Sequence, residues 1–96
     1  MEVRIQAIHF DAAEKLTDFI NKKAERLARR FPDITVIDAT LKVVKPETAN
    51  NKEALLKVTA PGIEEIASKT ADTFEEAVDT CLEALSRQLE KKKDRR

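Results

Sequence analysis

The chain opens with an alternation of apolar and polar residues and then changes to a helical period. Residues 1–9 have the period-2 pattern of a half-buried strand, with its apolar positions at Val3, Ile5 and Ala7. The next segment spaces its apolar residues three and four apart, which predicts an amphipathic helix that ends before Pro32. The residues of this stripe are Leu16, Ile20, Ala24, Leu27 and Phe31, with Phe19 at its edge.

Two helix starts carry the spacing of a capping box. Asp11 is followed three residues later by Glu14, and Thr73 in the same way by Glu76. The second box predicts another amphipathic helix, with acidic residues in its first turn and basic residues in its last, as the helix dipole prefers. Its apolar stripe is Phe74, Val78, Cys81, Leu85 and Leu89.

Between the two predicted helices the pattern returns to period 2. A second strand is predicted from the inward positions Ile37, Ala39, Leu41 and Val43, and a third from Ala54, Leu56 and Val58. The polar segment "KPETANNK", which includes Pro46, predicts the loop between these two strands. The residues "APG" at 60–62 predict a tight turn into a short fourth strand around Glu64–Ser68.

The resulting order is β-α-β-β-β-α, which predicts an α+β fold. We expect a two-layer sandwich in residues 1–96, with one four-stranded sheet and both helices packed on one of its faces. The last residues, "KKKDRR", are expected to fray. The side chains that we expect to be buried include Leu16, Ile20, Leu27, Phe74, Val78, Cys81 and Leu85.

Composition is consistent with one small globular domain. Of the 96 residues, 42% are hydrophobic, which is too many for a disordered chain, and 38% are charged, which predicts a well-solvated surface. The single cysteine cannot form an internal disulfide, which favours a cytoplasmic protein. The N-terminal residues have neither the apolar run of a signal peptide nor the length of a membrane span, so no membrane partner is expected.

The formal net charge is zero, but the charges are segregated along the chain. The segment Lys22–Arg30 has a net charge of +4, Ile63–Glu83 of −6 and Ser86–Arg96 of +4. A charge distribution of this kind can orient an approaching partner even though the total is zero.

Catalytic chemistry finds little support in the sequence. His9 and Cys81 are the only His and Cys, and they are not spaced with partners for a zinc site. Cys81 lies on a predicted apolar stripe, which favours a buried and inert thiol. With one glycine in the chain there is no phosphate-binding loop. Four carboxylates share a helical face but are better explained as a solvated surface than as a metal site: Glu75, Glu76, Asp79 and Glu83. We therefore expect neither an enzyme nor a cofactor, metal or small-molecule substrate.

The basic clusters predict contact with a phosphate backbone. Lys22, Lys23, Arg26, Arg29 and Arg30 occupy a helical arc of about 120° beside the apolar stripe. Arg87, Lys91 and Arg95 are spaced at i, i+4 and i+8 on the second helix. Each cluster alone also suits an ordinary helix C-terminus, but two clusters over one sheet face could form a single surface along an RNA backbone. Tyr and Trp are absent, which disfavours recognition by base stacking.

Three segments resemble one known family. The opening strand "VRIQAIHF" with His9, the helix "FINKKAERLARRF" and the closing helix "AVDTCLEALSRQLEKKK" are similar, in the same order and spacing, to the short ribosome hibernation-promoting factors. This family is also called ribosome-associated inhibitor A or, under an older name, sigma-54 modulation protein. Three positions depart from it: relatives often have Lys in place of Ala84 and Lys, Arg or Asn in place of Glu90, and many have Tyr in place of Glu75. A double-stranded RNA-binding domain shares part of the element order, but its last helix begins with lysines where this chain has "DTFEE".

The resemblance implies a cytoplasmic, ribosome-associated protein that silences idle ribosomes in stationary phase or stress. The implied partner is the small ribosomal subunit and its ribosomal RNA, in the channel for messenger and transfer RNA between head and body; a second hibernation factor on the ribosome is compatible with it. It also implies a short form without the C-terminal dimerisation domain of long members. The family's RNA-facing residues map to Lys22, Lys23, Arg26 and Arg29, and to Arg87 and Lys91. The alternative is a non-enzymatic regulator of the sigma-54 modulator type, which meets a basic protein through its acidic helix face.

Overall fold

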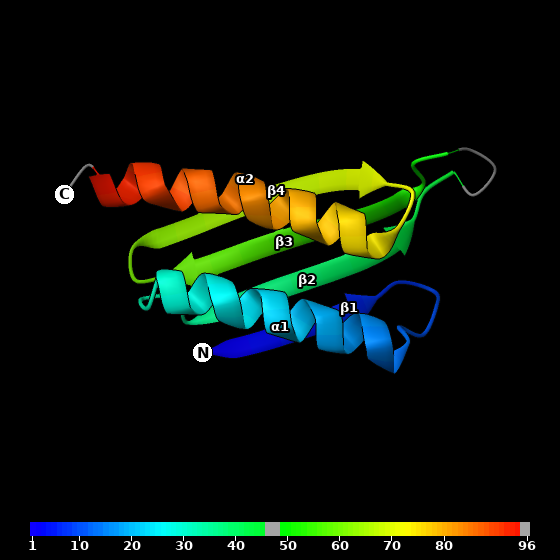
Figure 1. Cartoon of the computed structure of the whole chain (residues 1–96), viewed down its shortest axis with the longest axis horizontal. Coiled ribbons are helices and arrows are strands. Elements are labelled where there is room, and N and C mark those ends of the chain that lie inside the picture. Colours follow the sequence, from blue (N-terminus) through cyan, green and yellow to red (C-terminus); the bar gives the residue numbers. More distant parts are fainter. Residues whose placement is uncertain (46–48, 95–96) are drawn as a thin grey trace.

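In the part of the chain that the structure describes, four strands and two helices follow one another in the order β-α-β-β-β-α, as predicted, and form an α+β fold (Figure 1). The structure is a computed structural model that describes residues 1–45 and 49–94. Pro46, which we placed in the loop between the second and third strands, and Arg95 lie outside the described residues. The elements are β1 (Glu2–Ala7), α1 (Glu14–Arg30), β2 (Val36–Val43), β3 (Lys52–Ala60), β4 (Ile63–Ala71) and α2 (Phe74–Asp94).

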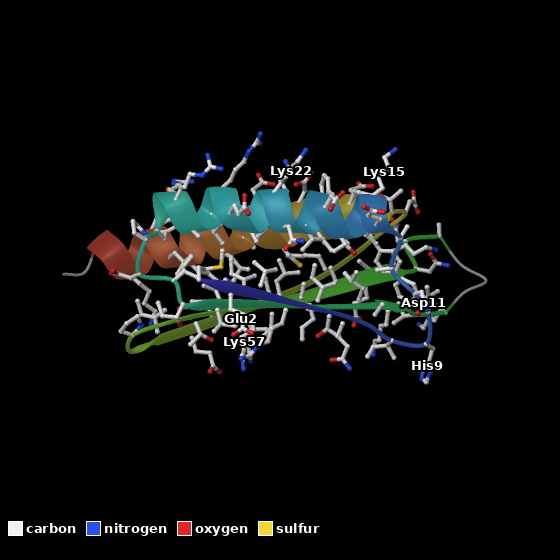
Figure 2. All side chains as sticks on the ribbon, turned by 90° about the horizontal axis from the view of Figure 1, so that it is seen from below. Glu2, His9, Asp11, Lys15, Lys22 and Lys57 are labelled. Atoms are coloured by element: carbon white, nitrogen blue, oxygen red, sulfur yellow. The ribbon has the colours of Figure 1, made fainter. Side chains whose placement is uncertain are left out.

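The strands form one sheet in the order β1-β2-β3-β4. β1 pairs with β2 in parallel, with Val3 opposite Ile37, because α1 crosses over between them. β2, β3 and β4 form an antiparallel meander, and Leu56 of β3 lies opposite both Ala39 and Ala67. Both helices cover the same face of the sheet, as predicted, while the other face carries side chains that point away from them (Figure 2).

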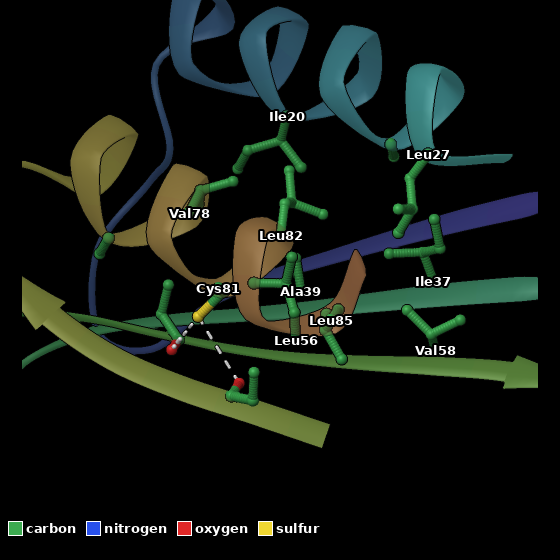
Figure 3. Packing of buried hydrophobic residues seen from close by; sticks show 14 of the residues in the cluster. Ile20, Leu27, Ile37, Ala39, Leu56, Val58, Val78, Cys81, Leu82 and Leu85 are labelled. Atoms are coloured by element: carbon green, nitrogen blue, oxygen red, sulfur yellow. Dashed lines mark hydrogen bonds between the residues drawn. The ribbon is translucent and has the colours of Figure 1, made fainter. Parts of the chain in front are cut away.

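The core lies between the sheet and the helices (Figure 3). Ile37, Leu56, Val58 and Leu85 are almost completely buried, and small residues beneath α2 bring that helix close to β3 and β4. The buried cluster confirms six of the seven predicted core residues: Leu16, Ile20, Leu27, Val78, Cys81 and Leu85. The seventh, Phe74, is only half-buried at the edge of the core, where it stacks on Phe10 with ring centroids 5.1 Å apart.

The start of α1 differs from the prediction. Its N-cap is Ala13, no side chain caps it, and the capping box expected at Asp11 is therefore absent. His9 has a φ of +63°, and Phe10 turns inward to the stack on Phe74, so the chain reaches the helix later than the spacing suggested. The end agrees with the prediction: the N–H of Phe31 donates to the carbonyl of Leu27 at 2.9 Å, and Pro32 follows.

The start of α2 agrees with the prediction, and its end does not. The hydroxyl of Thr73 accepts a hydrogen bond from the N–H of Glu76 at 3.1 Å, as a capping residue should. The residues expected to fray begin at Lys91, but α2 continues to Asp94. The strands also differ in part: β4 extends to Ala71, and Val43, which was expected to face the core, is 38% exposed at the end of β2. Gly62 occupies the β3–β4 turn with a φ of +72°.

Candidate nucleic-acid interface

The two helices run in the same direction, so their basic C-terminal halves lie at the same end of the molecule (Figure 1). Two ion pairs cross between the helices and show this alignment. Lys23 Nζ lies 3.3 Å from Asp79 Oδ1, and nearer the C-terminal ends of both helices Arg30 pairs with Glu90. The acidic residues at the start of α2 lie beside the first half of α1. The helical layer is therefore polarised along its length.

Three of the predicted cations form the outer row of α1. Lys22, Arg26 and Arg29 are exposed, and none of them makes an ion pair of 4.0 Å or less with a side chain in the described part of the chain. Lys22 points away from the sheet, opposite to Lys57 on the uncovered face (Figure 2). Free, exposed cations in a row on one helix face are suited to contact with successive phosphates.

The other two cations of α1, Lys23 and Arg30, form an inner row that faces α2. Besides its pair with Asp79, Lys23 Nζ lies 5.5 Å from the centroid of the Phe19 ring. Arg30, which pairs with Glu90, has its Cζ 5.3 Å from the centroid of the Phe31 ring. These contacts hold both side chains in the space between the helices. The sequence pattern did not separate them from the outer row.

An open groove of about 440 Å³ runs between the helices. From α1 the inner-row residues Lys23 and Arg30 line it, together with Arg26, the one residue of the outer row that reaches it. Asp79, Glu83 and Ser86 line it from α2, and Leu27 and Leu82 complete its lining. One wall of the groove is therefore basic and the other acidic. The sequence analysis identified the acidic face of α2 but not its position opposite the cations of α1. The charge segregation along the chain hinted at it, but the pairing appears only once the two helices are side by side.

The predicted cations of α2 lie on other sides of that helix. Arg87 is exposed, and its Nε donates to the carbonyl oxygen of Glu83, one turn earlier, at 3.5 Å. Lys91 is exposed and lines a separate hollow of about 190 Å³ together with Gln88, Lys92 and Glu65 of β4. This hollow lies on the flank of α2 that faces β4, away from α1. The acidic wall separates the two basic clusters, so they do not form the continuous surface that we considered from the sequence.

Other candidate chemistry is located away from these cations. The thiol of Cys81 is completely buried and donates to the carbonyl oxygens of Ala54 at 3.2 Å and Ala67 at 3.6 Å (Figure 3). Burial raises the pKa of Cys81 to about 11, so the thiol is neutral and unreactive at neutral pH. Across residues 1–45 and 49–94, no three His, Cys, Asp or Glu side chains are grouped so that they could hold a metal ion. Within the same residues, neither helix is long and apolar enough to cross a membrane.

Comparison with known proteins identifies the family. The profile of the family described as "Sigma 54 modulation protein / S30EA ribosomal protein" matches residues 3–96. The chain belongs to this family. It is 30% identical over 95 residues to the ribosome hibernation promoting factor of Pseudomonas putida, with 99% of this chain and 89% of that protein covered. The ribosome hibernation promoting factor of Azotobacter vinelandii is 32% identical over 95 residues, and the match spans 99% of this chain and 85% of that protein.

Solved structures of similar fold agree with this assignment. A ribosomal subunit interface protein from Coxiella burnetii superposes with a TM-score of 0.87 and 23% identity, covering 98% of this chain and 99% of the other. The N-terminal domain of Protein Y from Thermus thermophilus gives a TM-score of 0.79 and 18% identity, covering 95% of this chain and 98% of the other. At these identities the similarity is one of fold. The resemblance inferred from "VRIQAIHF" and the two helix segments is confirmed at the level of the family.

Proposed function

We propose that this protein is a ribosome-associated hibernation factor that binds small-subunit ribosomal RNA and silences idle ribosomes. In this proposal residues 1–96 act in the cytoplasm as one ribosome-binding domain without catalytic activity. The domain occupies the channel for messenger and transfer RNA between head and body of the subunit. Its family membership and the names of its curated relatives support the association with ribosomes.

The outer row of α1 carries the proposal. Lys22, Arg26 and Arg29 are exposed and have no ion-pair partner among the described side chains, so a phosphate can bind them without displacing a carboxylate. Arg87 and Lys91 add two exposed cations at the same end of the helical layer. With no Trp or Tyr in the chain, the contact is to the RNA backbone and its shape and not to base sequence.

The test is co-sedimentation of the protein with purified small ribosomal subunits over a series of salt concentrations. The test variant removes the outer row by Lys22→Gln, Arg26→Gln and Arg29→Gln. The matched control removes three cations from the opposite face of the sheet by Arg4→Gln, Lys42→Gln and Lys57→Gln. Both variants lower the net charge by the same amount, so a difference in binding between them cannot come from net charge alone.

We expect the wild type to bind and the outer-row variant to bind roughly tenfold or more weakly at physiological salt. The slope of log affinity against log salt should also become flatter by about 0.7–0.9 for each phosphate that the variant no longer neutralises. The control variant should bind as the wild type does, and inhibition of cell-free translation should follow binding. A wild type that stays in the supernatant would contradict the proposal. It would then favour the regulator that meets a basic protein through Glu76 and its neighbours.

A further inference from the structure

Three acidic side chains of α2 line up along the flank that faces the basic residues of α1. Asp79, Glu83 and Glu90 are spaced at i, i+4 and i+11, which places them on one side of a helix. Asp79 and Glu83 line the interhelical groove, and Asp79 and Glu90 pair with Lys23 and Arg30. This flank therefore places negative charges beside the cations at the edge of the proposed RNA-binding surface.

These contacts divide the cations of α1 into two classes. The outer row has no ion-pair partner among the described side chains, whereas a phosphate that approaches the inner row must first displace a carboxylate. The side chains of Asp79 and Glu90 are 50% and 43% exposed, so both pairs are solvated and can open. Displacing an exposed ion pair of this kind should weaken the binding of a phosphate by a factor of about 1.5 to 5.

We propose that Asp79 and Glu90 restrain the affinity of this protein for ribosomal RNA by occupying Lys23 and Arg30. The inference rests on the proposed function. It assigns a role to Glu90, which pairs with Arg30 near the C-terminal ends of both helices. The two carboxylates confine phosphate contact to the outer row and lower the affinity below the value that all five cations of the segment Lys22–Arg30 would give. They act on affinity through Lys23 and Arg30 and do not touch the RNA themselves.

A purely structural role for the same pairs makes a different prediction. If Lys23–Asp79 and Arg30–Glu90 only fasten the helices together, removing the carboxylates should loosen the helical layer and leave binding unchanged or weaker. Exposed pairs contribute little to stability, and the buried contacts of Leu27, Leu82 and Leu85 already hold the helices over the sheet. Measurement of binding and of thermal unfolding on the same variants separates the two roles.

The experiment measures the affinity for purified small subunits of Asp79→Asn, Glu90→Gln and the double variant over a salt series. Glu76→Gln is the matched control, because it removes the same charge from an exposed side chain of the same helix that makes no ion pair within the described residues. A second arm adds Lys23→Gln to Asp79→Asn. If Asp79 acts through Lys23, the gain from Asp79→Asn should disappear in the combined variant.

We expect each single substitution to tighten binding about two- to fivefold and the double variant to combine both gains. The salt slope should steepen by about 0.7–0.9 for each cation that gains a phosphate. Glu76→Gln should change the affinity and the salt slope less than either Asp79→Asn or Glu90→Gln does. A wild type that binds together with variants that bind no tighter, or only as Glu76→Gln does, would overturn the restraint and leave the proposed function intact. A wild type that does not bind would overturn the proposed function itself.

Discussion

Leu27 connects the proposed binding helix to the sheet, and its replacement by Ala tests the packing that positions the cations. The side chain is 5% exposed and lies above the sheet near Ile37 (Figure 3). Replacing a buried Leu by Ala costs about 2–5 kcal/mol, because the transfer energy of the removed carbons is lost and a cavity remains. Leu27 also lines the open interhelical groove, so water can partly fill the space. We therefore expect the lower half of the range, about 2–3.5 kcal/mol.

Two further Leu→Ala replacements calibrate this value. Leu85 belongs to α2 and is completely buried, so the cost of its replacement should lie in the upper half of the range for Leu→Ala, about 3.5–5 kcal/mol. Leu55 is 38% exposed on the uncovered face of the sheet, and its replacement should cost less than about 1 kcal/mol. The expected order of destabilisation is thus Leu85, Leu27, Leu55.

Urea unfolding followed by circular dichroism measures the three values, since the chain has no Trp or Tyr to serve as a fluorescent reporter. A domain of this size has a free energy of unfolding of about 5–14 kcal/mol, so the Leu27 variant should still fold. Its Tm should fall by about 10–25 °C. If the Leu27 variant is destabilised by less than about 1 kcal/mol, or by less than the Leu55 variant, the face of α1 that contacts the sheet has been assigned wrongly.

Four other predictions concern single residues. The thiol of Cys81 should react slowly in the folded protein and rapidly after unfolding, and fast labelling of the native state would contradict its burial. In the folded protein the pKa of Cys81 is raised to about 11, so the thiol of the unfolded chain ionises at lower pH. The free energy of unfolding should therefore fall as the pH rises from about 9 towards 11, and this fall should be smaller in the Cys81→Ala variant. Thr73→Ala should lower stability by about 1 kcal/mol and Thr73→Asp should largely restore it, whereas equal losses would exclude a capping role. Gly62→Ala should cost about 1–2 kcal/mol through its positive φ alone, since no heavy atom beyond the two neighbouring residues lies within 4 Å of the added carbon. A neutral outcome would mean that the turn has rearranged.

The accuracy of the sequence predictions depended on how local the determining interactions are. Apolar periodicity identified the buried faces of both helices, because burial of one face is what that pattern records. The capping box at Asp11 failed because the position of Phe10 depends on Phe74, far away in the chain. Val43 has the inward phase of its strand, but a period-2 pattern does not show where the covering layer ends. For the same reason, the wheel of α1 grouped Lys23 with Lys22, although only Lys23 has a carboxylate of α2 within reach.

Because the two helices point in the same direction, the charge distribution of each single helix becomes a charge distribution of the whole molecule. Each helix separately places acidic residues near its start and basic residues near its end, as its dipole favours. α1 returns from β1 to a parallel β2, and the two hairpins that follow make β4 parallel to β2 again, so α2 returns in the same direction as α1. The two helices therefore add their charge gradients, whereas antiparallel helices would have cancelled them. A chain with no net charge thus acquires one basic end, and that end can orient the protein towards a phosphate-rich surface while Asp79 and Glu90 limit how tightly it is held.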